Sequence, residues 1–358
     1  MKNNIYIFSN SILSRKNNTF KIEKMSDAEA IHEIDIYEDD REYVILPSPK
    51  YESNGEAKYL PAETIEAFYT FGEVRFNAQF FKCLSYYSIP LHMFNYYGNY
   101  IGSFIPVDNE GDGSIQLLQS QFYFDQQKRL YIARTILEAA VKNISDNLNS
   151  YSYEGIELDE QINKINVLLD QIRLSISVDE LRGFEGNVRN IYYQCWPEIF
   201  KQKFDFDKRI KNPPYGIINS LISFGNSLMY AVCLSEIYRT RLNPYIGFIH
   251  EPGNKKHSLA YDISEIFKPV IVDRVIFRVI NLKIISANDF TSKNGIYLLK
   301  DKARQKFVEE FEKRLSTVIT HRRLNRRISY RSLIRMECFN LINFMIGKIK
   351  SYEPYKGI

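Results

Sequence analysis

The chain has 358 residues, of which 45% are hydrophobic and 25% charged, a composition typical of soluble globular proteins with room for two domains. Its four cysteines are far apart and form no CxxC pair, which argues against a zinc ribbon or a secreted disulfide framework and favours a reducing cytoplasm. The net charge of +4 is unevenly divided: residues 1–112 hold 10 basic and 17 acidic side chains, whereas the remainder holds 37 and 26. We therefore expect a cytoplasmic protein whose second part faces a polyanion.

The first hundred residues predict β structure. Short aromatic or β-branched segments alternate with Gly, Pro and Asn, as in a strand-rich domain. A Gly-Asn pair at 98–99 predicts a hairpin turn, and Asn77 is placed to cap a short helix. The acidic residues 25–58 suggest an insertion at the edge of this domain. The expected strands are 4–9, 19–23, 42–47, 67–76 and 90–106.

The composition of residues 107–113 predicts a linker. Beyond it, apolar residues recur with a period of 3.6, which predicts helices to the end of the chain. The most apolar segment, 217–239, holds several Asn and Ser residues, which favours a buried helix over a membrane span. Because strands precede helices, we expect an α+β fold, with an N-terminal β-sandwich domain over 1–106 and a larger all-α domain over 114–358. The expected helices are 114–148, 160–176, 178–196, 217–239, 258–281 and 301–350.

Two glutamates and a histidine stand out in apolar or small-residue surroundings: Glu185, His250 and Glu265. Two carboxylates and an imidazole suit Mn²⁺ or Mg²⁺ and could polarise a phosphate. Taken alone, each has a purely structural explanation, such as a surface salt bridge between Glu185 and Arg189 or a core hydrogen bond of His250. Asp262 and Glu265 lie on one face of an apolar helix, and two such carboxylates favour a nearby cation.

A second candidate region is strongly basic. Residues 321–335 contain six arginines and no carboxylate. At helical spacing Arg323, Arg327 and Arg331 line one face, with Tyr330 beside them. A charge run is commonly a solvated face, but six like charges on one helix repel one another unless a polyanion is near, so phosphate contact is favoured. The candidate DNA-binding residues are Arg322, Arg323, Arg326, Arg327 and Arg331.

The order and context of these residues resemble the CRISPR adaptation integrase, the first and most widespread family of Cas proteins. That family is similar in placing a glutamate in a Gly-Asn-Arg-like helix, a histidine after a Gly-Phe/Tyr motif, and a carboxylate fifteen residues further on. Here 65 residues separate Glu185 from His250 and 15 separate His250 from Glu265. The stretch from the Pro-Pro pair at 213–214 to the histidine, and the strand-rich block around 71–104, extend the resemblance over nearly the whole chain.

The resemblance implies a metal-dependent DNA endonuclease and integrase, which inserts short duplexes (spacers) into the CRISPR repeat array by attack of a 3′-hydroxyl on a phosphodiester. It implies that the helical domain is the catalytic and DNA-binding one, and that Glu185, His250 and Glu265 are its catalytic residues and the ligands of Mn²⁺ or Mg²⁺. Asp262 matches a neighbouring acidic position of the family, and we expect Asp262 and Arg189 to surround these ligands. It also implies a homodimer that joins a small second Cas protein in a heterohexameric integration complex on double-stranded DNA, with no membrane involved.

Such a reaction needs no Ser, Cys or Tyr nucleophile from the protein, because the DNA carries its own 3′-hydroxyl; the protein must align two DNA segments and stabilise the leaving oxygen. Two other functions fit the same residues: a stand-alone repair nuclease that cleaves branched DNA, and a non-catalytic DNA-binding subunit. Strand transfer into a repeat would argue against the repair nuclease. Loss of activity with retained DNA binding after a change at Glu265 would argue against the non-catalytic subunit. A zinc hydrolase is disfavoured, because the sequence has no HExxH motif and its cysteines are not clustered.

Overall fold

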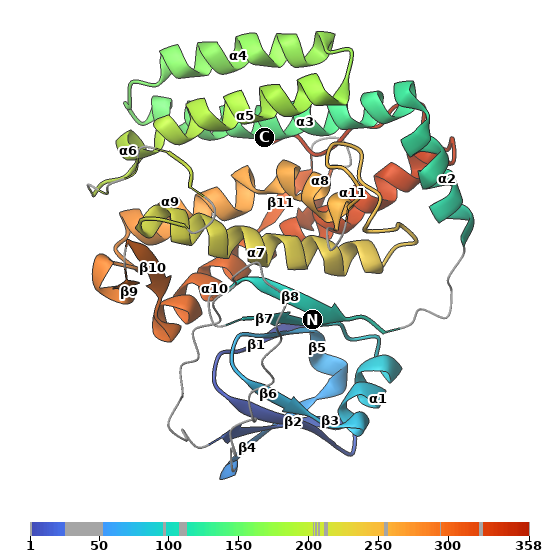
Figure 1. Cartoon of the computed structure of the whole chain (residues 1–358), viewed down its shortest axis with the longest axis vertical. Coiled ribbons are helices and arrows are strands. Elements are labelled where there is room, and N and C mark those ends of the chain that lie inside the picture. Colours follow the sequence, from blue (N-terminus) through green and yellow to red (C-terminus); the bar gives the residue numbers. More distant parts are fainter. Residues whose placement is uncertain are drawn as a thin grey trace, which may run out of the picture. The chain divides into compact units, whose positions relative to one another are not determined.

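The computed structural model describes residues 2–357 apart from 26–52, 96–97, 107–112, 203, 205, 207, 211–213, 254–256, 294 and 322–324. The chain divides into two compact units, Met1–Asn109 and Glu110–Ile358. Strands dominate the first unit and helices the second (Figure 1), which confirms the expected α+β class. The strand expected at 42–47, most of the acidic stretch 25–58 and the linker up to residue 112 lie outside the described residues.

The first unit contains two four-stranded sheets with an apolar core between them. One sheet has the strand order β1-β5-β7-β8 and the other β4-β3-β2-β6. The Phe20 ring of one sheet lies 5.1 Å from the Phe68 ring of the other and 5.2 Å from Phe80 on α1, so both sheets and the helix share this core. The elements are β1 (Asn3–Ile7), β2 (Ser11–Lys16), β3 (Thr19–Met25), β4 (Ser53–Pro61), β5 (Ile65–Thr70), β6 (Val74–Phe76), α1 (Ala78–Tyr86), β7 (Leu91–Phe94) and β8 (Tyr100–Phe104).

Some local sequence signals in this unit correspond to observed structure, although the expected strands omitted β2 and β4. Asn77 caps α1 by accepting a hydrogen bond from the Phe80 backbone N–H, as its side chain predicts. Gly98 has a φ of 81° in the turn that joins β7 to β8. The single strand expected over 67–76 is instead two strands in different sheets. The chain crosses between them at Gly72, where a Cβ atom would lie 2.8 Å from the backbone of Ser9.

The second unit is built around long helices. Helix α3 is the longest, and the side chains of Asn143 and Asn147 on its buried face donate to the carbonyl oxygens of Ile266 and Pro269, at 2.8 and 2.6 Å. The helices are α2 (Gly113–Phe124), α3 (Gln126–Tyr153), α4 (Asp159–Leu174), α5 (Val178–Gln194), α6 (Trp196–Ile199), α7 (Ile217–Tyr238), α8 (Ser258–Phe267), α9 (Arg274–Asn281), α10 (Asp301–Ser316) and α11 (Tyr330–Met345).

The helix expected over 258–281 is interrupted at Pro269. Residues Pro269–Asp273 form one π-helical turn between α8 and α9, in which the Asp273 N–H bonds to the Lys268 carbonyl five residues back. Proline has no N–H to continue the regular ladder, and this accounts for a change of winding at this point. The interruption lies four residues after Glu265.

Helix α7 is long and apolar enough to cross a membrane by composition alone, but 72% of its apolar window is buried inside the structure. Its polar residues find partners there: Asn219 donates to the Tyr215 carbonyl at 2.8 Å, and Ser220 donates to the Tyr297 carbonyl. Gly225 allows close packing, since a Cβ there would lie 2.6 Å from the Val272 side chain. The helix has the burial of a core helix, as the sequence predicted.

The expectation of an all-α second unit is wrong in two places. Two antiparallel hairpins are present: β9 (Phe290–Lys293) with β10 (Ile296–Leu299), and β11 (Val318–His321) with β12 (Arg326–Ser329). The second hairpin occupies part of the helix expected over 301–350, and α11 begins only at Tyr330, capped by the Ser329 side chain. Three consecutive β-branched residues, Val318–Thr320, favour a strand here, and Ile319 lies opposite Ile328.

Candidate metal centre

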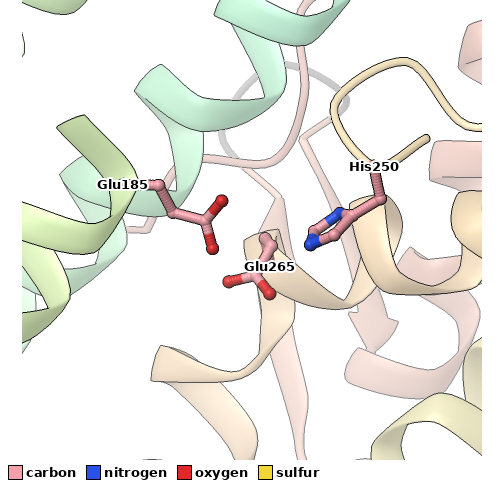
Figure 2. A group of neighbouring side chains, drawn as sticks. All are labelled: Glu185, His250 and Glu265. Carbon is pink, nitrogen blue, oxygen red and sulfur yellow. The ribbon is translucent and has the colours of Figure 1, made fainter. Parts of the chain in front are cut away.

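Three segments far apart in sequence bring Glu185, His250 and Glu265 together. Helix α5 carries Glu185, the loop before α8 carries His250, and α8 itself carries Glu265. One ligand atom from each lies within 4.8 Å of the other two, and Figure 2 shows the three side chains facing a common space. Three ligand atoms separated by 4.8 Å would each lie about 2.8 Å from their common centre, compared with metal–ligand distances of about 2.1 Å for Mg²⁺. Shifts of about 0.7 Å or less would therefore let a divalent ion contact all three residues.

The Asp262 side chain binds the loop Phe248–Glu251, which carries His250. Its buried carboxylate accepts the backbone N–H groups of Phe248, Ile249 and His250 at 2.5, 3.0 and 3.0 Å, and lies 2.8 Å from His250 Nδ1. Because a carboxylate only accepts, Nδ1 carries the ring proton and Nε2 is the nitrogen with a free lone pair. Burial lowers the pKa of His250, but the bond to Asp262 and the surrounding carboxylates raise it by more. Asp262 thus sets the tautomer in which His250 can bind a metal.

Gly247 allows this arrangement. Its N–H donates to the Ser258 hydroxyl at 2.9 Å, and that hydroxyl donates to the Tyr245 carbonyl at 2.6 Å. A Cβ at Gly247 would lie 2.8 Å from the Ser258 backbone and 2.9 Å from Asp262 Oδ2. The glycine of the GFIH motif is therefore required for the loop to lie close against α8.

Two cations hold Glu265. Nη2 of the partly buried Arg189 on α5 lies 2.5 Å from Oε2, and the buried Lys268, directly after α8, contacts Oε1. Burial alone would raise the pKa of Glu265, but Lys268, Arg189 and His250 outweigh it and hold this pKa well below its usual range. Glu265 is therefore ionised at physiological pH and available as a ligand.

The pKa of Glu185 is shifted in the opposite direction. Burial raises its pKa, and the negative charge of Glu265 raises it further. Two carboxylates facing each other in a partly buried space repel, and a cation between them removes that repulsion. The donor set thus fits a divalent ion on electrostatic as well as geometric grounds.

The structural explanation considered for Glu185, a surface salt bridge with Arg189, is not supported among the described residues, because Arg189 is partly buried and bonds to Glu265. Its other nitrogen, Nη1, lies 3.9 Å from Asp273 Oδ2, and burial raises the pKa of Asp273 to about 7. Sequence reasoning missed both Lys268 and Asp273. The i, i+3 spacing of Glu265 and Lys268 on one apolar helix was a signal that could have identified the lysine.

The basic segment differs more from its prediction. Arg326 and Arg327 are exposed on β12, whereas Arg331 on α11 pairs with Glu312 at 2.7 and 2.9 Å. Arg335 pairs with Glu236 at 2.6 Å. Carboxylates from other helices therefore neutralise the two helical arginines, and no polyanion is needed to explain them. Arg322 and Arg323 lie outside the described residues.

A strand-rich unit, a helical unit and a carboxylate–histidine–carboxylate cluster are the features expected of a nuclease with an acidic metal-binding centre. The family model described as CRISPR associated protein Cas1 matches residues 5–313, so the chain belongs to the Cas1 family. The CRISPR-associated endonuclease Cas1 of Fusobacterium nucleatum is 39% identical over 356 residues, covering 99% of this chain and 97% of that protein. The Clostridium perfringens endonuclease is 38% identical over 360 residues, covering 100% and 99%.

Solved structures agree with this assignment. A CAS1 protein from Thermotoga maritima has a TM-score of 0.80 at 31% identity and covers 99% of this chain and 100% of that one. A casposase bound to integration product has a TM-score of 0.81 at 20% identity, covers 99% and 93%, and shares the fold. The resemblance inferred from the sequence is confirmed, and with it the class of enzyme: an endonuclease and integrase of CRISPR adaptation.

Proposed function

We propose that Glu185, His250 and Glu265 bind one Mn²⁺ or Mg²⁺ ion, and that the protein uses this centre to join the 3′-hydroxyl ends of short DNA duplexes to phosphodiesters of the CRISPR repeat. The convergence of their three ligand atoms within 4.8 Å carries this proposal. When bound, the ion would supply Lewis-acid polarisation of the scissile phosphate.

Each residue has a distinct part in holding the ion. His250 offers Nε2, because Asp262 keeps the proton on Nδ1. Glu265 is kept ionised by Arg189 and Lys268. These two cations also bring positive charge close to the position where a phosphate would approach the cluster, and preorganised charge of this kind stabilises the charge that develops as the leaving oxygen departs.

The donor set also bears on the choice of ion. Mg²⁺ prefers oxygen ligands, whereas Mn²⁺ accepts imidazole more readily at similar geometry. We expect activity with both ions, with Mn²⁺ effective at lower concentration, and none in excess chelator. Equal titrations with the two ions would contradict the argument from ligand softness, and full activity in chelator would contradict the metal mechanism.

The assembly we propose is a cytoplasmic homodimer that joins the small second Cas protein, Cas2, in a heterohexameric complex on double-stranded DNA. Solved structures with this fold include one titled as a Cas6-RT-Cas1–Cas2 complex, with a TM-score of 0.80 at 17% identity. The excess of basic residues beyond residue 112 supports a DNA-facing second unit. The exposed Arg326 and Arg327 are its described candidates for phosphate contact, with Arg322 and Arg323 in the same segment.

The decisive experiment is strand transfer of a labelled duplex into a plasmid that carries the repeat, with Cas2 and Mn²⁺ present. Glu185→Ala, His250→Ala and Glu265→Ala should each abolish transfer while the protein stays folded. Glu160→Ala, which changes an exposed glutamate paired only with Lys164 among its described ion pairs, is the matched control and should retain activity.

Near-normal transfer by any one of the three variants would show that this residue is not a ligand. A wild-type protein that cleaves branched DNA but never transfers a strand would favour the repair nuclease. Transfer that persists in all three variants would favour a non-catalytic DNA-binding role for this chain.

A further inference from the structure

The loop Phe248–Glu251, which carries His250, is also held from the side opposite Asp262. Arg129 Nε on α3 donates to the Phe248 carbonyl at 3.1 Å, and Arg182 Nε on α5 donates to the Ile249 carbonyl at 3.0 Å. Asp262 already takes the N–H groups of residues 248–250. The backbone polar groups on both sides of the loop are thus satisfied by side chains from three different helices.

The same two arginines meet at one carboxylate. Arg129 Nη2 lies 2.7 Å from Glu251 Oε1, and Arg182 Nη2 contacts the same oxygen. Tyr123 donates its hydroxyl to Glu251 Oε2 at 2.6 Å, and the Arg129 guanidinium lies 4.4 Å from the Tyr123 ring centre. Each arginine therefore holds the loop in the same way, with Nε on a backbone carbonyl and Nη2 on Glu251.

Such an arrangement differs from an ordinary surface ion pair. Isolated exposed pairs contribute little, but here the carboxylate receives three donors and each guanidinium makes two fixed bonds. Burial raises the pKa of Glu251, yet the bonds from Tyr123 and Arg129 lower it to about 2, so the network is ionised throughout the working range. A lysine could not replace either arginine, because one ammonium cannot hold the planar fork geometry.

The positions of Arg182 and Arg129 show which elements this network connects. Arg182 lies three residues before Glu185, about one turn away on the same helix. It therefore links the helix that carries one proposed ligand to the loop that carries another. Arg129 fixes the same loop to α3, the longest helix of the unit.

We propose that Arg129, Arg182 and Glu251 are positioning residues, which fix His250 relative to Glu185 and so preorganise the centre before a divalent ion binds. The inference rests on the proposed function, since it requires His250 to ligate the ion. Partners that orient a metal-binding histidine are commonly worth about 10- to 100-fold in metal affinity. Nothing in the network touches the ion or the DNA in this role.

The test measures Mn²⁺ binding to the full chain without DNA, by calorimetry and by Mn²⁺-induced broadening of the His250 ring signals. Glu251→Gln and Arg182→Lys should each weaken binding about 10- to 100-fold. Arg173→Gln is the matched control, because Arg173 also bridges two helices through carboxylates, Asp170 and Glu138, and it should bind Mn²⁺ as the wild type does. Tyr123→Phe removes one donor and should cost about fivefold, the equivalent of one hydrogen bond.

A double-mutant comparison separates positioning from a general effect on the fold. If Glu251 acts through the histidine, then Glu251→Gln should have no further effect in a His250→Ala background. Wild-type Mn²⁺ affinity in Glu251→Gln and Arg182→Lys, or effects that add in full to that of His250→Ala, would overturn the inference while the proposed metal centre stands. Unchanged Mn²⁺ affinity in His250→Ala alone would overturn both. Where Glu251→Gln does not fold, Tyr123→Phe gives the same comparison.

Discussion

Replacing Asp262 with asparagine exchanges one oxygen for an NH₂ group and tests how the histidine is held. In the wild type, Oδ2 accepts from the N–H groups of Phe248 and Ile249, and Oδ1 accepts from the N–H and Nδ1–H of His250. The site thus offers four donors to a side chain that is fully buried. An asparagine has one acceptor oxygen, so two donors must face its NH₂ group whichever way the amide turns.

The two orientations have different costs. If the NH₂ group faces Phe248 and Ile249, two backbone donors lose their partner, at about 1–3 kcal/mol each. If it faces His250, only one backbone donor is lost, because the imidazole can move its proton to Nε2 and accept at Nδ1. The second orientation is the less costly, and its consequence is a protonated Nε2 that cannot bind a metal. We therefore expect a loss of stability of about 1–3 kcal/mol and a loss of Mn²⁺ affinity as large as that of His250→Ala.

Urea denaturation gives the stability of Asp262→Asn, and calorimetry gives its Mn²⁺ affinity. Asp170→Asn, at an exposed position that pairs with Arg173, is the control and should change neither quantity. Wild-type Mn²⁺ affinity in a folded Asp262→Asn protein would refute the tautomer argument. A destabilisation of about 2–6 kcal/mol with metal binding intact would show that the amide turns the other way.

Three further predictions concern other parts of the molecule. Burial raises the pKa of Glu337 to about 7, above the unfolded value near 4.3, so its contribution to stability is complete below about pH 4 and is lost as the pH rises through 7. In the wild type, the free energy of unfolding measured by urea denaturation should fall by about 3 kcal/mol between pH 5 and 8, and in Glu337→Gln this fall should be absent. A variant with the pH profile of the wild type would contradict this. Gly247→Ala places a Cβ 2.8 Å from the Ser258 backbone and should cost about 1–3 kcal/mol and weaken Mn²⁺ binding; wild-type values of both would show that the loop adapts freely. Joint replacement of Arg326 and Arg327 by Ala should weaken DNA binding and reduce the slope of log affinity against log salt by about 2, whereas an unchanged slope would mean that β12 faces elsewhere.

Local sequence patterns predicted the structure correctly where neighbouring residues alone determine it. The Asn77 cap and the turn at Gly98 each follow from the chemistry of one or two residues. The three proposed ligands were identifiable because a family resemblance linked their spacing, although none of them was convincing alone. The helix assigned across residues 317–329 was wrong because the prediction followed the run of arginines and overlooked the β-branched residues Val318–Thr320.

Partners distant in sequence could not be predicted. Nothing near Arg331 or Arg335 indicates that Glu312 and Glu236 will neutralise them, since the second pair is separated by 99 residues. The same holds for Arg129 and Glu251, which meet only because α3 and the histidine loop pack together. Charge counted along a segment therefore overestimates the charge that the folded protein exposes.

The π-helical turn Pro269–Asp273 determines the direction in which the side chains of α9 face. In an α-helix one residue corresponds to about 100° of rotation, so regular α-helical winding of these same residues would turn α9 by that angle. Arg274, which now bonds to Asn147 at 2.6 Å, and Phe277, whose ring lies 4.8 Å from that of Trp196, would then face away from their neighbours. The π-helical turn thus takes up one residue more than regular winding would, and the packing of α9 beside the proposed metal centre depends on it.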